Sequence, residues 1–278
     1  VGKEGLFPGR DHFAIQGAVD YVSRLGGGVV RMLPGRYSLR NSIFLGSGVT
    51  LEGCGDDTVL GRSLFSDISS LISDVDWYGW KVEIGGAAAS WRVGDGLMIQ
   101  SHSVDGGTEP QFTRHTVIAV GDGFLGLGSQ PRVNHWVDKE ATAIPAYSLI
   151  EARYARGVRM QNFSLDGGGA GIPNLDGNHG AAIFLQDCED ISISKVSVRD
   201  FHGDAISWQI VHDVVVEDCV IERAHACGLH AGSGSQRPIM RRNVISDCLD
   251  GIFWCWGVRD GLAEAGIEVE INFRVKRY

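Results

Sequence analysis

Four stretches of this sequence repeat at a constant offset of 23 residues: AIFLQ at 182–186, AISWQ at 205–209, GLHAG at 228–232 and GIFWC at 251–255. In each stretch a small residue is followed by an aliphatic one. A repeat this regular predicts a stack of equivalent coils, in which each sequence column becomes a column in space. The interior of the stack should therefore be lined by the aliphatic column, Ile183, Ile206, Leu229 and Ile252.

A second short strand repeats in the same frame. Ile191–Ile193 aligns with Val214–Val216 at an offset of 23, and Pro238–Met240 follows at 24. Two alternating strands per period, joined by Gly, Asn and Asp turns without an intervening helix, are typical of a right-handed parallel β-helix. We therefore predict an all-β fold with about 23 residues per coil and with coils about 4.8 Å apart.

The rest of the sequence divides the chain into four zones. Residues 1–62 contain a helical apolar period over 11–25, which predicts a capping α-helix, followed by the first coils. In residues 63–147 the 23-residue frame is lost while short strands continue, which predicts a β-rich insertion. Residues 148–266 hold the main coils, and residues 267–278 form a terminal strand of alternating apolar and polar positions.

Two interpretations of this terminal strand stay open. The strand could cap the open end of the stack. Alternatively, the chain is truncated, and its uncapped edge pairs with a second copy to form a homo-oligomer. The sequence favours neither interpretation.

Composition excludes some classes of function. The formal net charge of −9 disfavours nucleic acid as a partner, because no basic stripe is present to neutralise phosphates. No apolar run reaches the length of a membrane span. The 6 cysteines lack paired metal or redox spacing, so most of them should be reduced core residues.

Several motifs carry a resemblance to a known superfamily. They are DHFAIQGAVD at 11–20, LPGRY at 33–37, GVTLEG at 48–53, GDAISWQ at 203–209 and GLHAGSGSQRP at 228–238. This set resembles the pectate-lyase-like superfamily of single-stranded right-handed β-helix proteins, in a bacterial branch of uncertain activity. The resemblance implies a secreted or periplasmic carbohydrate-active enzyme that acts on a polysaccharide or oligosaccharide.

The outward columns of the repeated strands are candidate substrate-binding positions. Residues next to an inward position point to the opposite face of a strand. Aromatic rings in such a column could stack on sugars, or they could only pack beneath the insertion. The candidates in these columns are Phe184, Ser207, Phe253, Gln186 and Gln209, and Trp256 is a further substrate-binding candidate next to them in the sequence.

Two aspartates recur in the turn that precedes these strands. Asp204 and Asp250 are two coils apart, so their backbones should be separated by about 9.6 Å, near the upper end for the carboxylates of an inverting glycosidase. One could protonate the leaving oxygen while the other activates water. The alternative is that both are ordinary turn-forming residues, particularly Asp250, which precedes a glycine.

His230 is the strongest single candidate for proton transfer, because an imidazole titrates near neutral pH. With Arg237 to bind a substrate carboxylate, and with His202, it would suit β-elimination from a uronate. The alternative is a histidine with a purely structural hydrogen bond.

Calcium is a further candidate ligand, although no cofactor is certain. Between Leu165 and Ala181 one coil is about ten residues longer than its neighbours, and long loops of a regular stack often bind ligands. Asp166, Asp176 and Asp187 bring carboxylates to this loop. Their spacing matches no defined calcium loop, so a solvated acidic loop is the alternative.

Three functions remain in order. A glycoside hydrolase comes first, because the candidate carboxylates recur in one column and that column contains no lysine. A polysaccharide lyase is nearly equal, and a non-catalytic carbohydrate-binding or truncated scaffold is the third. The sequence does not identify the sugar.

Overall fold

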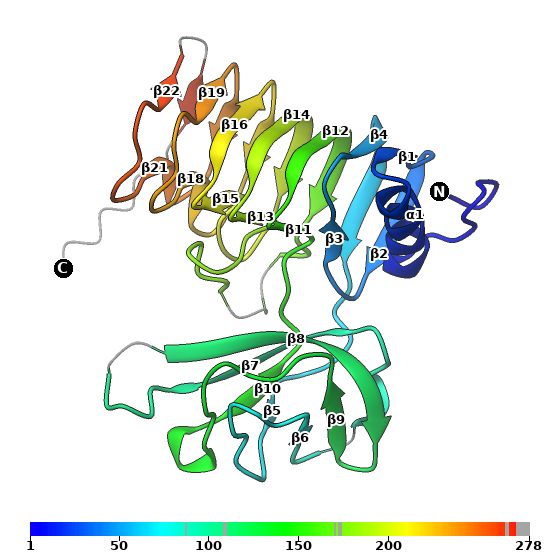
Figure 1. Ribbon diagram of the computed structural model, residues 1–278, viewed down its shortest axis with the longest axis vertical. Coiled ribbons are helices and arrows are strands. Elements are labelled where there is room, and N and C mark those ends of the chain that lie inside the picture. Colours follow the sequence, from blue (N-terminus) through cyan, green and yellow to red (C-terminus); the bar gives the residue numbers. More distant parts are fainter. Residues whose placement is uncertain (87, 108–109, 170, 172–173, 265–266, 271–278) are drawn as a thin grey trace. The chain divides into compact units, whose positions relative to one another are not determined.

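The computed structural model describes residues 1–86, 88–107, 110–169, 171, 174–264 and 267–270 (Figure 1). The chain divides into two compact units. Unit 1 comprises residues 1–62 and 148–278, and unit 2 comprises residues 63–147. Within the described residues, no helix is both long enough and apolar enough to cross a membrane.

Unit 1 is a parallel β-helix, in which successive coils contribute strands to two sheets (Figure 1). The first sheet contains β1 (Gly28–Arg31), β4 (Val49–Arg62), β12 (Arg156–Asp166), β14 (Glu189–Arg199), β16 (His212–Glu217), β19 (Ile239–Arg241) and β22 (Leu262–Ala263), with β2 (Gly35–Leu39), β17 (Val220–Glu222), β20 (Val244–Ser246) and β23 (Glu268–Glu270) paired alongside. The second sheet contains β3 (Ile43–Leu45), β11 (Ile150–Arg153), β13 (Ile183–Gln186), β15 (Ile206–Gln209), β18 (Cys227–Ala231) and β21 (Asp250–Trp254). All of these strand pairs are parallel.

The register of the second sheet confirms the predicted stacking. Ile183 pairs with Ile206, Ile206 with Leu229, and Leu229 with Ile252. The first three side chains are completely buried, so they line the core as expected, whereas Ile252 in the last coil is half-buried. Burial of apolar surface stabilises a folded protein by about 25 cal/mol per Å². Each coil that adds to this continuous core therefore adds to the stability of the fold.

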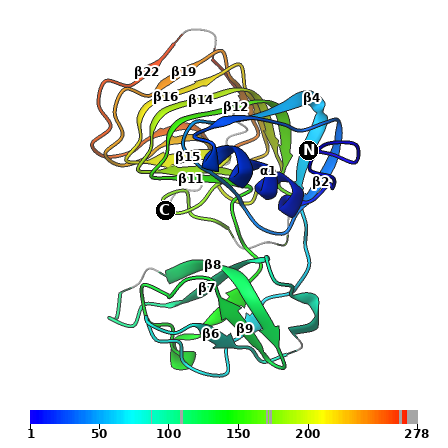
Figure 2. The same cartoon turned by 45° about the vertical axis from the view of Figure 1, so that its right-hand side comes forward.

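The predicted helix closes the N-terminal end of the stack. It is α1 (His12–Arg24), and it lies across the end of the first coils in Figure 2. The Asp11 side chain caps it by accepting a hydrogen bond from the backbone N–H of Ala14 at 2.9 Å. Ile15 and Val19 on its inner face are buried, which covers the apolar end of the stack.

Turns between strands place residues with positive φ in columns. One such column contains Asp190, Asp213, Arg237 and Asp260. Within it, Arg237 donates two hydrogen bonds to Asp213 in the preceding coil, at 2.7 and 2.8 Å. The hydrogen bonds from Arg237 hold the pKa of Asp213 below its usual range. Similar pairs join Arg242 to Asp218 and Arg223 to Asp200. The turn columns therefore carry ladders of ion pairs on the surface.

One coil is longer than the others, as the sequence predicted. Ile150 pairs with Ile183 at an offset of 33 residues, ten more than in the following coils. Of the described residues in this longer coil, Gly177 lies over the second sheet, where its carbonyl accepts hydrogen bonds from Ser207 and Gln209 of β15. At the other end of unit 1, β23 pairs with β20 in parallel register, so it continues the first sheet as a further coil. Residues 271–278 of the predicted terminal strand lie outside the described residues.

Unit 2 consists of antiparallel β-structure. Its strands run in the order β5 (Ser69–Ser70), β10 (Thr142–Ile144), β7 (Gly96–His102), β8 (Pro110–Gly121), β9 (Phe124–Leu127) and β6 (Lys81–Glu83), with short 3-10 helices η1 (Ala88–Ser90) and η2 (Val137–Lys139). Val82, Ile99, Val117 and Leu125 are buried in its core. Trp91 joins this core and meets Phe65 edge to face, with ring centroids 5.2 Å apart.

Candidate functional site

Most side chains in the outward column of the second sheet are buried, although they point away from the core of the coils. In register it consists of Phe44, Glu151, Phe184, Ser207, His230 and Phe253. Phe44 and Phe253 at its ends are 43% and 42% exposed, whereas the four residues between them are at most 5% exposed. The expectation of an open aromatic face therefore holds only at the ends.

The long loop covers the centre of this column. The Ser207 hydroxyl donates to the carbonyl of Gly177, and the Gln209 side-chain amide reaches the Gly177 carbonyl at 3.5 Å and Asn178 Oδ1 at 3.4 Å. A Cβ atom added to Gly177 would lie 2.7 Å from His230 Nδ1 and closer still to the Asp204 carboxylate. The loop backbone can approach these side chains this closely only because residue 177 is glycine.

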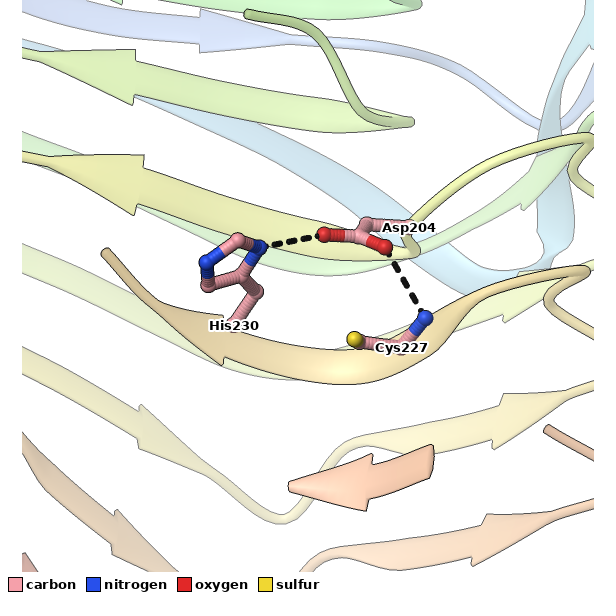
Figure 3. A group of neighbouring side chains, drawn as sticks. All are labelled: Asp204, Cys227 and His230. Atoms are coloured by element: carbon pink, nitrogen blue, oxygen red, sulfur yellow. Dashed lines mark hydrogen bonds and ion pairs between the residues drawn. The ribbon is translucent and has the colours of Figure 1, made fainter. Parts of the chain in front are cut away.

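Asp204 and His230 form a buried hydrogen-bonded pair in adjacent coils (Figure 3). Asp204 lies in the turn before β15 and is 2% exposed, and His230 lies on β18 and is 5% exposed. Asp204 Oδ2 lies 2.7 Å from His230 Nδ1, and Oδ1 accepts the backbone N–H of Cys227 at 2.9 Å. Both carboxylate oxygens therefore have partners, and Nδ1 carries the proton that faces Asp204.

The environment of His230 favours its charged form. Burial alone would lower the pKa of His230, but the hydrogen bond and the negative charge of Asp204 outweigh burial, and the net effect raises it. The second ring nitrogen, Nε2, faces away from Asp204 and Cys227 (Figure 3). It is shielded from solvent and has no hydrogen-bond partner. A buried nitrogen in this state is unusual and is free to take part in chemistry.

Cys227 completes a small cluster with this pair. Within the described part of the chain, the one group with three metal-ligating side chains close together is Asp204, Cys227 and His230, whose ligating atoms all lie within 4.8 Å of one another. Burial, together with the charges of Asp204 and Asp250, raises the pKa of the Cys227 thiol. The thiol is therefore protonated, both carboxylate oxygens of Asp204 have hydrogen-bond partners, and the backbone of Gly177 lies close by. These features are typical of a hydrogen-bonded cluster and not of a metal site.

The second predicted carboxylate lies in a different environment. Asp250 pairs in register with Cys227, which places the coil of Cys227 between Asp250 and Asp204 as the repeat predicted. Asp250 is exposed, whereas Asp204 is buried. The two carboxylates therefore differ in their access to solvent, and the structure does not place them as a matched pair.

Two further residues proposed for elimination lie apart from His230. Arg237 lies in the turn before β19, where it forms the ion pair with Asp213 and lines a surface pocket over β14, β16 and β19. His202 packs against His225, with ring centroids 4.2 Å apart. Neither of them contacts His230 in any described hydrogen bond or ring contact.

The remaining substrate-binding candidates fall into two groups. Phe184 and Gln186 are engaged by Arg153, which lies over the Phe184 ring at 5.3 Å and donates to the Gln186 side chain. Phe253 and Trp256 are on the last coils, and Trp256 is 89% exposed. The Phe253 ring meets the His230 ring edge to face at 5.0 Å. Only this second group presents aromatic surface to solvent near His230.

The three aspartates proposed for calcium have separate roles. Asp166 forms an ion pair with Arg36 at 2.9 Å. Asp176 accepts hydrogen bonds from the backbone and side chain of Asn178, as in an Asx turn. Asp187 occupies a turn position with φ of 52°. Among the described residues, these three do not form a cluster of metal-ligating type.

The sequence indicated no role for three residues of this face, which are Glu151, Arg153 and Cys255. Glu151 is 4% exposed and pairs with Arg153 at 3.1 Å. The alternation of Ile150–Arg153 matches that of β13, but the offset is 33, so a comparison at 23 misses it. The third is Cys255, whose Sγ lies 3.1 Å from the Ser233 hydroxyl. The prediction that most cysteines are reduced core residues is confirmed, since all six thiols are free and Cys188, Cys219, Cys227 and Cys248 are buried, whereas Cys54 is exposed.

One comparison with known proteins, the family match, agrees with the architecture. Residues 147–273 match the family described as "Right handed beta helix region". No curated protein sequence matches the chain. Among solved structures, a protein from Parabacteroides merdae provisionally described as a glycosyl hydrolase has a TM-score of 0.49 at 16% identity, with 94% of this chain and 88% of that chain covered.

Two further solved structures are similar at the same level. The A-module of the mannuronan C-5 epimerase AlgE6 from Azotobacter vinelandii has a TM-score of 0.47 at 15% identity, covering 87% of this chain and 54% of that chain. The catalytic domain of a GH87 α-1,3-glucanase has a TM-score of 0.47 at 10% identity, covering 87% of this chain and 30% of that one. The strand order, the register and the family match agree, and the chain is a right-handed parallel β-helix protein.

Proposed function

We propose that this chain is a carbohydrate-active enzyme in which His230 transfers a proton. The observation that carries the proposal is the buried hydrogen bond between Asp204 and His230 Nδ1, which leaves Nε2 without a partner. A carboxylate in this position fixes the tautomer and the orientation of the ring, and it stabilises the imidazolium that forms when Nε2 takes a proton. Asp204 is a positioning residue in this scheme, because it acts through His230.

A carbohydrate substrate is supported by the surface beside this pair. Phe253 contacts the His230 ring, and Trp254 and Trp256 are 40% and 89% exposed on the same coils. Aromatic side chains offer flat apolar surface for the C–H faces of sugar rings. The resemblance to the pectate-lyase-like superfamily implies the same class of substrate. Because Nε2 is shielded, substrate binding must displace a neighbour, and the half-exposed Phe253 ring is placed to move.

The arrangement supports elimination over the hydrolysis that was first expected. An inverting hydrolase needs one carboxyl group to protonate the leaving oxygen and another to activate water. Asp204 already accepts from Cys227 and His230, so it is not free for either task. In β-elimination one base removes the C5 proton of a uronate while the C4–O bond breaks. An unprotonated Nε2 can take that proton and then return it to the leaving oxygen. We therefore place polysaccharide lyase first and glycoside hydrolase second.

The test is an assay of the full chain on a panel of uronate-rich and neutral polysaccharides. Two products are followed, namely the ultraviolet absorbance of an unsaturated uronate and new reducing ends. Wild type is compared with His230→Gln and with His225→Gln, a control at an exposed histidine. Absorbance that is lost in His230→Gln and kept in His225→Gln supports the lyase.

Two other outcomes revise the proposal. Reducing ends without absorbance, lost in His230→Gln, would identify a hydrolase that uses the same histidine. If neither absorbance nor reducing ends appear, and calorimetry detects binding of one polysaccharide, catalysis is rejected in favour of the non-catalytic scaffold.

A further inference from the structure

Cys255 lies two residues after Phe253, which pairs in register with His230, and its thiol interacts with the His230 side chain. Cys255 follows β21, and its backbone N–H donates to the carbonyl of Ala231 at 2.8 Å, which fixes it in the coil beside His230. Its side chain is half-buried, and Sγ lies 3.1 Å from the Ser233 hydroxyl. Because Asp204 occupies Nδ1, the nitrogen left to face a thiol is Nε2.

Polar groups from three coils hold this thiol in place. The Ser233 backbone N–H donates to Gln209 Oε1 at 2.9 Å, and Gln209 is in turn anchored to the loop residue Asn178. The Ser233 hydroxyl is therefore presented to Sγ from a fixed backbone. Asp204, His230 and Cys255 follow one another across adjacent coils in the order carboxylate, imidazole, thiol.

We propose that Cys255 is a nucleophile activated by the Asp204–His230 pair and that it attacks the carbonyl carbon of an ester, such as an O-acyl group on a sugar. The order carboxylate, imidazole, nucleophile is the arrangement by which a base removes a proton from a weak nucleophile. The inference shares His230 with the proposed function, but it requires no cleavage of a polysaccharide backbone.

The electrostatics agree with this geometry. Burial alone would raise the pKa of the Cys255 thiol, yet its interactions with Ser233, with the nearby imidazole of His230 and with the Trp256 backbone outweigh burial and lower it. The same contact contributes to the raised pKa of His230, after the larger effects of burial and Asp204. In the buried thiols Cys219 and Cys227, burial raises the pKa instead. Cys255 is thus distinguished from the core cysteines by its partners.

The chemical step balances with water as the co-reactant. Nε2 takes the thiol proton, the C–S bond forms, the ester C–O bond breaks, and the imidazolium returns the proton to the leaving alkoxide. A water molecule then attacks the thioester while Nε2 accepts its proton. The C–S bond breaks, the carboxylic acid leaves, and the proton returns to sulfur. The sum is ester and water giving acid and alcohol.

The first experiment measures alkylation of Cys255 by iodoacetamide as a function of pH, resolved by peptide mass spectrometry of the full chain. Cys54 is exposed and serves as the internal control. A lowered thiol pKa raises the thiolate fraction more than it lowers the nucleophilicity of the thiolate. We expect His230→Gln and the isosteric Asp204→Asn to move the alkylation midpoint of Cys255 to higher pH, to slow its alkylation at pH 7, and to leave Cys54 unchanged.

The second experiment uses p-nitrophenyl acetate as the ester probe. The expected result is an acetyl thioester at Cys255, together with p-nitrophenol release that Cys255→Ser removes and Cys54→Ser does not. An alkylation midpoint at Cys255 that is unchanged in both pair variants would overturn the proposal, as would ester hydrolysis at the wild-type rate in Cys255→Ser. Neither readout involves a polysaccharide. This inference can therefore fail while the proposed function stands, and the proposed function can fail while this inference stands.

Discussion

Mild acid should destabilise unit 2 through two buried histidines. His135 is completely buried, and its Nδ1 and Nε2 each lie 3.0 Å from a hydroxyl, those of Ser101 and Thr113. His115 is 7% exposed and lies 2.8 Å from Thr113 and 3.1 Å from Ser129. This hydroxyl and imidazole chain contains no carboxylate, so an added proton on either ring finds no charge to neutralise it.

The magnitude follows from the two pKa values. Burial lowers the pKa of both His115 and His135 from 6.5 to about 4, and His115 adds a repulsive effect on His135. The unfolded chain binds more protons than the folded one between these values, so stability falls as pH falls below about 6.5 and levels off below about 4. At pH 5.5 each histidine costs about 1.4 kcal/mol, and the full cost is about 3 kcal/mol each.

The assay is native-state hydrogen exchange on the full chain at pH 7.5 and 5.5, resolved by peptide and corrected for the pH dependence of intrinsic exchange. Protection of β7 and β9 in unit 2 should fall by about tenfold for each histidine, whereas β15 in unit 1 serves as the internal reference. In the double variant His115→Asn, His135→Asn, amides replace both rings and do not titrate, so the pH dependence should disappear. His102→Gln, at an exposed histidine of unit 2, is the matched control.

The reasoning is refuted if β7 and β9 keep their protection at pH 5.5 in the wild type. It is refuted equally if protection falls by the same factor in the double variant, because the titrating group would then lie elsewhere. A fall confined to wild type and His102→Gln is the only pattern that the buried histidines explain.

Three further predictions concern unit 1. Gly177→Ala should lower Tm and abolish any activity that depends on His230, because the new Cβ would overlap the Asp204 carboxylate and force the loop away. Thermal unfolding and the polysaccharide assay measure these two effects. Asp11→Ala should destabilise by about 1 kcal/mol through loss of the helix N-cap, as measured by urea unfolding. Gly17→Ala should stabilise by about 0.5–1 kcal/mol in the same experiment, because its nearest neighbour lies 3.7 Å from the new Cβ and alanine favours the helix.

The coils could be predicted because a β-helix converts sequence offset directly into spatial register. Ile183, Ile206 and Leu229 stack as their 23-residue spacing required, and a slip of one residue would turn them to the outward face. The same argument predicted the long coil but not its path, since the ten additional residues follow no repeat. Their contact with His230 depends on Gly177, and a glycine in a loop has many explanations.

The candidate site was only partly predictable for the same reason. The sequence placed Asp204 and His230 in adjacent coils, but it could not show that the loop buries them or that Asp204 binds the ring. Arg237 was assigned to the wrong neighbours by sequence proximity to His230. Its actual partner, Asp213, lies 24 residues earlier in a turn column whose positive φ values are visible only in the structure.

The architecture explains why the candidate chemistry is spread over several coils. Each coil presents about one side chain to a given outward column, so no single coil can supply a carboxylate, an imidazole and a nucleophile. Asp204, His230 and Cys255 therefore come from three consecutive coils, and the hydrogen bonds between strands keep their order fixed. Both proposals require the same nitrogen, His230 Nε2, and it can serve only one proton at a time. Cys255→Ser separates them, since it removes the thiol while leaving Asp204 and His230 in place for proton transfer to a sugar.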